Sequence, residues 1–251
     1  MSERSTAEIV AEAIRESSMT VVLTGLFLGA RESEDLTHGR GQWRERASLE
    51  AFLTEPQRFW EYYVPAAKVI GEREPNPGHG ALARMQERGN IDALVTQAVD
   101  RLHARAGSRD VVEVYGSVLV HRCQRCDERY GLVELDRFVS ASDDGIPRCD
   151  TPDCGYPLRP EGTLWGEPLI EEAVKEAWEL AARAELMIIF DSDLQTAPIS
   201  LLPSVPLTRG TDLIIVGSDP TQYDRYAKLV VREERSTDVI VDVDGLLAGS
   251  S

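Results

Sequence analysis

The sequence predicts an α/β fold, namely a doubly wound, Rossmann-like parallel sheet with a small inserted module. Short segments that are apolar throughout alternate with helical patterns, which is typical of a parallel sheet covered by helices on both faces. The first apolar segment ends at Gly25, as in nucleotide-binding folds of this class. All four cysteines lie in one stretch between two predicted strands, which indicates an insertion and not a terminal domain.

The predicted strands are three to five residues long and are bounded by turn or polar residues. They cover residues 20–24, 93–96, 111–115, 186–190, 213–216 and 239–241. Because both alternating faces of each segment are apolar, we expect the strands to be buried on both sides of the sheet.

Helical periodicity separates these strands. Residues 5–17 begin with Ser5 and Glu8 in a capping-box pattern and place apolar side chains on one face. Further helices are predicted from about 46 to 63, over 77–88 and over 171–184. The stretch around the cysteines has turn residues and little periodicity.

The composition limits the possible partners. The formal net charge is −16, and such an acidic surface repels phosphate backbones, so we expect no direct nucleic-acid binding. No apolar run approaches the roughly 20 residues of a membrane helix, and the N-terminus has no signal-peptide core, so we predict a cytoplasmic protein without a membrane partner. The scarcity of lysine fits either a GC-rich genome or a high-salt habitat.

The cysteines have the spacing Cys123-x2-Cys126, 22 residues, then Cys149-x4-Cys154. Two close pairs at this separation suit a tetrahedral zinc ion held by four thiolates. A disulfide framework is the competing interpretation, and it is weaker because a cytoplasmic protein keeps its thiols reduced. We expect the zinc to be structural, since four thiolates leave no open position for a substrate.

These features predict three parts. Residues 1–119 form the first part of the Rossmann-like domain and contain a helical cofactor-loop region at about 26–75. Residues 120–160 form a small zinc-ribbon-like module. Residues 161–251 complete the Rossmann-like domain.

Several segments together resemble the sirtuin family. Residues 96–108 are similar to its TQN(I/V)DGLH…AGS motif, and residues 114–117 stand where the family has LHGS. Arg159-Pro160 and residues 165–167 resemble its RP…FGE segment, with a helix start at 77–79 and a PTxxD segment at 220–224. Order and spacing agree from about residue 20 to 225.

The resemblance implies an NAD-binding domain, a small zinc module and a cleft between them for an acyl-lysine peptide. Sirtuins transfer the acyl group to ADP-ribose and release nicotinamide. It also implies cofactor-binding roles for Gly25, Gln97, Asp100 and Ser192, and it places Tyr115 at the position of the family's catalytic histidine. An acylated peptide or protein partner is therefore expected.

The departures from the family pattern fall on the chemistry. Phe27 replaces the second glycine of the first turn, where a ring should crowd a pyrophosphate. Glu32, Glu34 and Asp35 add negative charge beside that turn, and His38 stands where the family has arginine. Ala98 replaces an asparagine, Asp191-Ser-Asp193 replaces a GTS segment, and Gly217 replaces an asparagine near the adenosine.

Tyr115 replaces a histidine to which the resemblance assigns the role of base on a ribose hydroxyl. A phenol has a pKa of about 10 against about 6.5 for histidine, so about one tyrosine in a thousand is ionised at neutral pH. Supplying the base form then costs roughly 4 kcal/mol.

Three hypotheses follow. The first is a sirtuin-like zinc protein with a degenerate NAD and catalytic site that lacks ordinary lysine deacylase activity and acts through ligand or partner binding. The second is an active NAD-dependent deacylase or ADP-ribosyltransferase with an altered mechanism using Tyr115. The third is a divalent-metal site formed by Glu32, Asp35, His38, Asp191 and Asp193, against a plain solvated acidic rim. Whether NAD still binds stays open.

Overall fold

The computed structural model describes residues 4–26, 28–29, 40–232 and 234–249. Its larger part is a six-stranded sheet in which all neighbouring strands are parallel. In order across the sheet, the strands are β3 (Val112–Glu113), β2 (Ala93–Thr96), β1 (Thr20–Thr24), β7 (Leu186–Phe190), β8 (Asp212–Val216) and β9 (Leu229–Val231). The chain moves outward from β1 to β3 and then returns to β7 beside β1. This is the predicted doubly wound arrangement.

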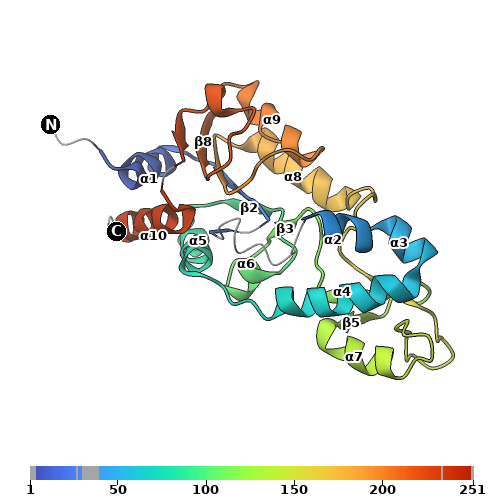
Figure 1. Cartoon of the computed structure of the whole chain (residues 1–251). Helices are drawn as coiled ribbons and strands as arrows, with labels where there is room; N and C mark the ends of the chain where they lie inside the picture. The colour runs from blue at the N-terminus through green and yellow to red at the C-terminus, as the bar shows by residue number, and fades with distance from the viewer. Residues whose placement is uncertain (1–3, 27, 30–39, 233, 250–251) are drawn as a thin grey trace.

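Helices cover both faces of this sheet (Figure 1). One face carries α1 (Thr6–Glu16), α5 (Pro77–Glu87) and α10 (Ser236–Ala248), and the other carries α8 (Glu171–Arg183) and α9 (Ser204–Leu207). Within β1, Val22 packs into the first of these cores, whereas Val21 and Leu23 pack into the second. Successive side chains of a strand point to opposite faces, so an entirely apolar strand can be buried on both sides, as predicted.

The strand predicted at residues 239–241 is wrong, because this segment lies inside α10. Val239, Val243 and Leu247 are buried at intervals of four residues along one face of this helix. A segment of three residues is too short to show that periodicity. The last strand is β9. The strand predicted at 111–115 is also shorter than expected, and Tyr115 lies just beyond the end of β3.

The cysteine stretch forms a second, antiparallel sheet with the strand order β5-β4-β6. These strands are β4 (Val120–Cys123), β5 (Arg129–Gly131) and β6 (Leu158–Pro160). The stretch also contains α7 (Leu132–Ser140), which was not predicted. Leu135 and Phe138 of α7 are buried, while Val133 is 89% exposed, so the helix presents only a narrow apolar stripe.

Three helices between β1 and β2 share a hydrophobic core with this small sheet, and α2 and α3 pack on α4 (Figure 1). They are α2 (Arg40–Arg46), α3 (Leu49–Thr54) and α4 (Pro56–Gly71), and α4 continues well beyond the predicted helix end at residue 63. Phe59, Trp60 and Tyr63 of α4 share one core with Leu135, Phe138, Cys123 and Cys149. The helical region and the cysteine module are therefore joined by a common core. The domain division at residues 119/120 and 160/161 stays a prediction.

The described part of the chain also contains α6 (Leu102–Arg105) and the short 3-10 helices η2 (Ile199–Leu201) and η3 (Asp224–Tyr226). None of the helices in the described ranges is both long and apolar enough to cross a membrane.

Asp244 on α10 links this helix to α5, and it provides a stability test. Its side chain is buried and accepts hydrogen bonds from Arg84 (2.8 Å between Arg84 Nε and Oδ2) and from Arg88. Asp244→Ala leaves two guanidinium groups without their shared partner, so we expect the free energy of unfolding to fall by about 2–4 kcal/mol. Chemical denaturation measures this loss. Asp242→Ala, on an exposed position of the same helix, should change stability by less than about 0.5 kcal/mol, and equal losses in both variants would contradict the prediction.

Candidate active site

The three-stranded sheet, α7 and the helices α2–α4 that share its core form a small lobe. The main cavity lies between this lobe and the six-stranded sheet and encloses about 790 Å³. β1 and β7 are adjacent, and the chain continues from them to opposite sides of the sheet, so their carboxyl ends form a topological switch point. In open α/β sheets, ligands bind in the crevice at this point. The loops after β1 and β7 contribute Leu26, Asp191, Ser192 and Asp193 to the cavity wall.

Three of the residues singled out from sequence meet in this cavity. The side-chain oxygen of Gln97 accepts a hydrogen bond from the Ser192 hydroxyl (2.6 Å), and the Gln97 amide nitrogen lies 3.5 Å from the Tyr115 hydroxyl. Gln97 and Ser192 are 4% and 5% exposed. The glutamine side chain, which follows β2, thus connects the loop after β7 with the segment after β3.

Tyr115 is half-buried, and its backbone oxygen accepts a hydrogen bond from the Thr163 amide (2.8 Å). Burial raises the pKa of the Tyr115 phenol above its usual value of 10.0, and nearby Asp193 raises it further, while the hydrogen bond with Gln97 has the opposite effect. The surroundings therefore make this phenol a weaker source of base at neutral pH than a free tyrosine.

Asp100 also lines the cavity but bonds to its own loop. Its carboxylate accepts a hydrogen bond from the Leu102 amide (3.1 Å) at the start of α6. Burial raises the pKa of Asp100, and the Leu102 amide and the guanidinium groups of Arg73 and Arg105 partly offset that effect. Within the described part of the chain, Asp100 forms no side-chain hydrogen bond with Gly25, Gln97, Tyr115 or Ser192.

Gly25 has a packing role of its own. A Cβ atom at this position would lie 1.7 Å from the backbone oxygen of Asp191, so a larger residue would force the loops after β1 and β7 apart. Gly25 is not among the described residues that line the main cavity, and its contact with a cofactor stays a prediction. Ala98, where the family has asparagine, is 4% exposed and is likewise absent from that lining.

The part of the cavity next to the small lobe is mainly apolar. Tyr63, Ile70, Val118 and Leu164 line it, and the Tyr63 hydroxyl donates to the Val118 backbone oxygen (3.1 Å). This hydrogen bond satisfies the buried Tyr63 hydroxyl, so this wall offers a neutral chain an apolar surface.

Arg44 is the one basic residue among the described cavity residues, and Asp100, Glu167, Asp191, Asp193 and Asp219 are acidic. The Arg44 guanidinium lies 4.3 Å from the centre of the Trp165 ring. No local motif in the sequence marked Arg44, because its place at the rim depends on how α2 packs against the segment after β6.

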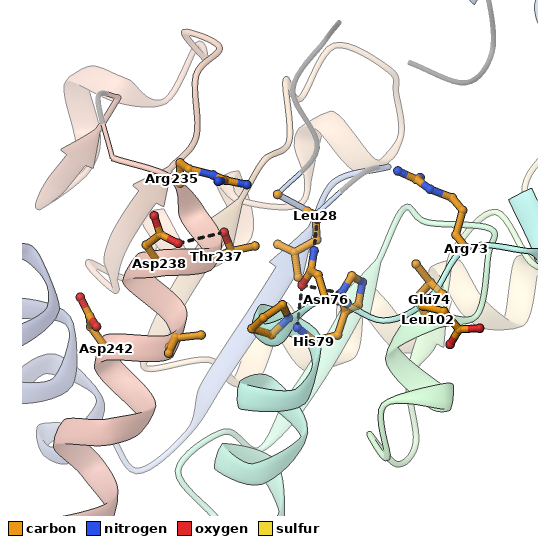
Figure 2. Close-up of a pocket in the computed structure, with 13 residues that line it drawn as sticks. Leu28, Arg73, Glu74, Asn76, His79, Leu102, Arg235, Thr237, Asp238 and Asp242 are labelled. Carbon is orange, nitrogen blue, oxygen red and sulfur yellow. Dashed lines mark hydrogen bonds between the residues drawn. The ribbon is translucent and has the colours of Figure 1, made fainter. Parts of the chain in front are cut away.

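A second cavity of about 620 Å³ lies between the starts of α5 and α10 (Figure 2). Asn76 and His79 close the start of α5 as a capping box, and the Asn76 amide also donates to the Leu28 backbone oxygen (2.7 Å). This cavity, which the sequence did not indicate, reaches Gly29 on the far side of the turn that follows β1.

The four cysteine sulfurs lie within 4.8 Å of one another. The sulfur pairs Cys123–Cys154 and Cys126–Cys149 are each 3.5 Å apart, and Cys126–Cys154 are 3.6 Å apart. Tetrahedral zinc with Zn–S bonds near 2.3 Å requires sulfur separations of about 3.8 Å, and a disulfide requires about 2.0 Å. The cluster has the geometry of a four-thiolate zinc site and not that of two disulfides.

Phe27, Glu32, Glu34, Asp35 and His38 lie outside the residues that the structure describes. Of the proposed divalent-metal group, only Asp191 and Asp193 are described. Within the described ranges, the four cysteines are the only group of three or more potential ligand residues close enough to hold one ion.

A Rossmann-like sheet with a cavity at its switch point and an inserted four-cysteine module defines a nucleotide-binding type of α/β protein. The Sir2 family matches residues 34–198. The chain is 35% identical over 228 residues to NAD-dependent protein deacetylase 1 of Pyrobaculum aerophilum, covering 89% of this chain and 88% of that protein. It is 35% identical to NAD-dependent protein deacetylase 1 of Geobacillus kaustophilus, covering 92% and 95%. The chain therefore belongs to the Sir2 family.

Solved structures agree with this assignment. Sir2Tm bound to a propionylated peptide superimposes with a TM-score of 0.85 at 30% identity, covering 98% of this chain and all of that one. A histidine-to-tyrosine mutant of Sir2 with a p53 peptide and NAD gives a TM-score of 0.84 at 30% identity, with coverage of 98% and 100%. The predicted family and fold class are confirmed.

Two buried histidines beside the site predict how stability depends on pH. Burial lowers the pKa of His79 to about 4 and that of His103 to about 3, and their rings lie 4.7 Å apart. Both imidazoles are neutral in the folded chain at neutral pH, whereas in the unfolded chain they take up protons with the ordinary histidine pKa of about 6.5. Stability should therefore be fully present above about pH 6.5 and fall as the pH is lowered toward the folded pKa values.

Chemical denaturation at about pH 7 and about pH 5 measures this slope. His103→Gln keeps a polar side chain within reach of the Thr24 hydroxyl (3.0 Å from His103 Nε2) but cannot titrate, so its slope should be clearly shallower. An unchanged slope in the variant would show that other groups cause the acid sensitivity.

Proposed function

We propose that this chain is a Sir2-family protein that binds an acyl-lysine peptide in the main cavity but deacylates it poorly, because its reaction centre lacks an effective base. The observation that carries the proposal is the phenol of Tyr115, which lies in the cavity beside Gln97 and whose pKa is raised by burial. Ordinary NAD-dependent deacylation then loses the step in which a ribose hydroxyl is deprotonated. Ligand or partner binding is left as the main activity.

The cavity supports the peptide part of this proposal. Its apolar wall of Ile70, Val118 and Leu164 suits a neutral acyl chain, and the exposed Trp165 lies at the rim, where a peptide backbone would arrive. Sir2Tm holds a propionylated peptide, and its fold covers almost the whole of this chain.

A second candidate is an NAD-dependent deacylase or ADP-ribosyltransferase that uses Tyr115. One specific observation favours it, namely that the Sir2 histidine-to-tyrosine mutant was solved with both a p53 peptide and NAD. In that protein a tyrosine is compatible with both ligands. The hydrogen-bonded Ser192–Gln97 pair beside Tyr115 would hold the phenol in place for an altered role.

Nicotinamide release from NAD in the presence of acetylated peptide separates these candidates. Under the first proposal, wild type and Tyr115→Phe release nicotinamide at equally low rates, because the phenol contributes no base. Tyr115→His supplies a base of suitable pKa, and at saturating NAD deacetylation should rise about 10²–10⁴-fold.

Mass spectrometry of the peptide follows deacylation directly. Thr54→Ala, which removes an exposed hydroxyl bonded to the Glu50 backbone oxygen (2.8 Å) within α3 and away from the cavity lining, is the control. Fast turnover by wild type that Tyr115→Phe abolishes would reject the first proposal and support the second candidate.

We further propose that Cys123, Cys126, Cys149 and Cys154 hold one structural zinc ion. The support is the compact sulfur geometry and the packing of Cys123 and Cys149 in the core shared by α4 and α7. Metal analysis should give about one zinc per chain.

Removing the metal should unfold the small lobe and leave the large sheet folded, because four unpaired thiolates repel one another. Hydrogen exchange after chelation should show lost protection in α4 and α7 but not in β1 or β7. Cys126→Ser should behave like the chelated protein, and Ser142→Ala, on the same module, should not. Unchanged protection after complete zinc removal would contradict the structural role.

A further inference from the structure

Asp191 lies at the switch point of the large sheet, directly after β7 and opposite the turn that follows β1. In doubly wound folds a nucleotide's phosphates bind here, against backbone N–H groups of the first turn and the start of a helix. In this chain a carboxylate from the protein already occupies such donors.

One oxygen of the Asp191 carboxylate accepts two hydrogen bonds. The Gly29 backbone amide donates to Asp191 Oδ2 (2.7 Å), and the Ser236 hydroxyl donates to the same oxygen. Gly29 belongs to the first turn, and Ser236 is the first residue of the 13-residue helix α10. One oxygen thus collects two donors from two different segments, as a phosphate oxygen would.

The backbone at Asp191 shows that this arrangement has a cost. Asp191 has φ = 50°, in the left-handed region that favours glycine. Gly25 and Gly217 pack against its backbone, and a Cβ at Gly217 would lie 3.1 Å from the Asp191 Cα. Both glycines hold Asp191 between the neighbouring loops, so its side chain has few other directions available.

The electrostatic surroundings add to this effect. Burial raises the pKa of Asp191, Ser236 and Gly29 partly offset the rise, and Asp219 from the loop after β8 increases it. Asp191, Asp193 and Asp219 line the main cavity, where Arg44 is the one basic residue among the described lining, whereas Gly29 lines the second cavity, to which Arg73 and Arg235 also contribute. A dianionic pyrophosphate that approaches the Gly29 amide from the main cavity therefore meets a carboxylate on its donors and further negative charge nearby.

We propose that Asp191 is a specificity-determining residue that competes with ligand phosphate for the Gly29 amide and the Ser236 hydroxyl. The cavity then discriminates against ligands that place a phosphate at the switch point, NAD included, and leaves binding of an uncharged nucleoside unaffected. This inference rests on the proposed function in one respect only, that the ligand of the site is a nucleotide.

Isothermal titration calorimetry with two probes tests the proposal without requiring turnover. ADP-ribose carries the pyrophosphate, and adenosine lacks it. Asp191→Asn removes the charge and keeps the side-chain shape, and Asp191→Gly frees both donors in a backbone conformation that glycine adopts readily. Asp219→Asn is the matched control, since it removes one charge from the main cavity and leaves the hydrogen bonds of Gly29 and Ser236 to Asp191 in place.

We expect Asp191→Asn and Asp191→Gly to bind ADP-ribose about tenfold or more tightly than wild type, while Asp219→Asn gains no more than about threefold and adenosine affinity stays constant in all variants. Equal gains in Asp219→Asn would show a general charge effect and overturn the proposal. So would unchanged or weaker ADP-ribose binding in both folded Asp191 variants. A protein without deacylase activity can still pass this test, so its outcome is separate from that of the Tyr115 experiment.

Discussion

The close approach of the loops after β1 and β7 is the constraint on which the rest of the site depends. These strands pair in parallel over their whole length, and the Gly25 amide donates to the Phe190 backbone oxygen (2.8 Å) where the strands end. Gly25 allows this contact because it has no Cβ. The described loop positions that follow, namely Leu26, Leu28 and Gly29 after β1 and residues 191–193 after β7, are therefore set by the sheet before any ligand is considered.

The sheet was predictable because its strands are buried on both faces. An apolar segment such as residues 186–190 has no polar side to place in water, so it can only be a central element. The same reasoning failed at residues 239–241, since a short apolar run does not distinguish a strand from one buried turn of a helix. α7 was missed for a different reason. Its apolar residues Leu132, Leu135, Phe138 and Val139 do recur at helical spacing, but the helix has only nine residues and lies among turn residues between the two cysteine pairs.

The candidate site was predictable only in part, because sequence order does not specify which loops meet. The cysteine spacing implied convergence of Cys123 with Cys154, and their sulfurs are indeed 3.5 Å apart. The family resemblance brought Gln97, Tyr115 and Ser192 into one group, and the structure links them through the Gln97 side chain. No pattern in the sequence could show that the Asp191 carboxylate turns toward Gly29. That contact requires the register of β1 against β7 and the position of α10, both of which are tertiary features.

Under the two proposals, Tyr115 and Asp191 affect different steps of the family reaction. Tyr115 is half-buried and bonds through Gln97, so under the proposed function its phenol would act on proton transfer. Asp191 satisfies two donors that an empty crevice would leave to water, so it contributes hydrogen bonds to the folded state while opposing phosphate. Restoring a base at Tyr115 cannot by itself restore nucleotide affinity, and freeing the Gly29 amide cannot supply a base. Because the two effects act on rate and on binding separately, their free energies should add, and the full family reaction would require both positions to change.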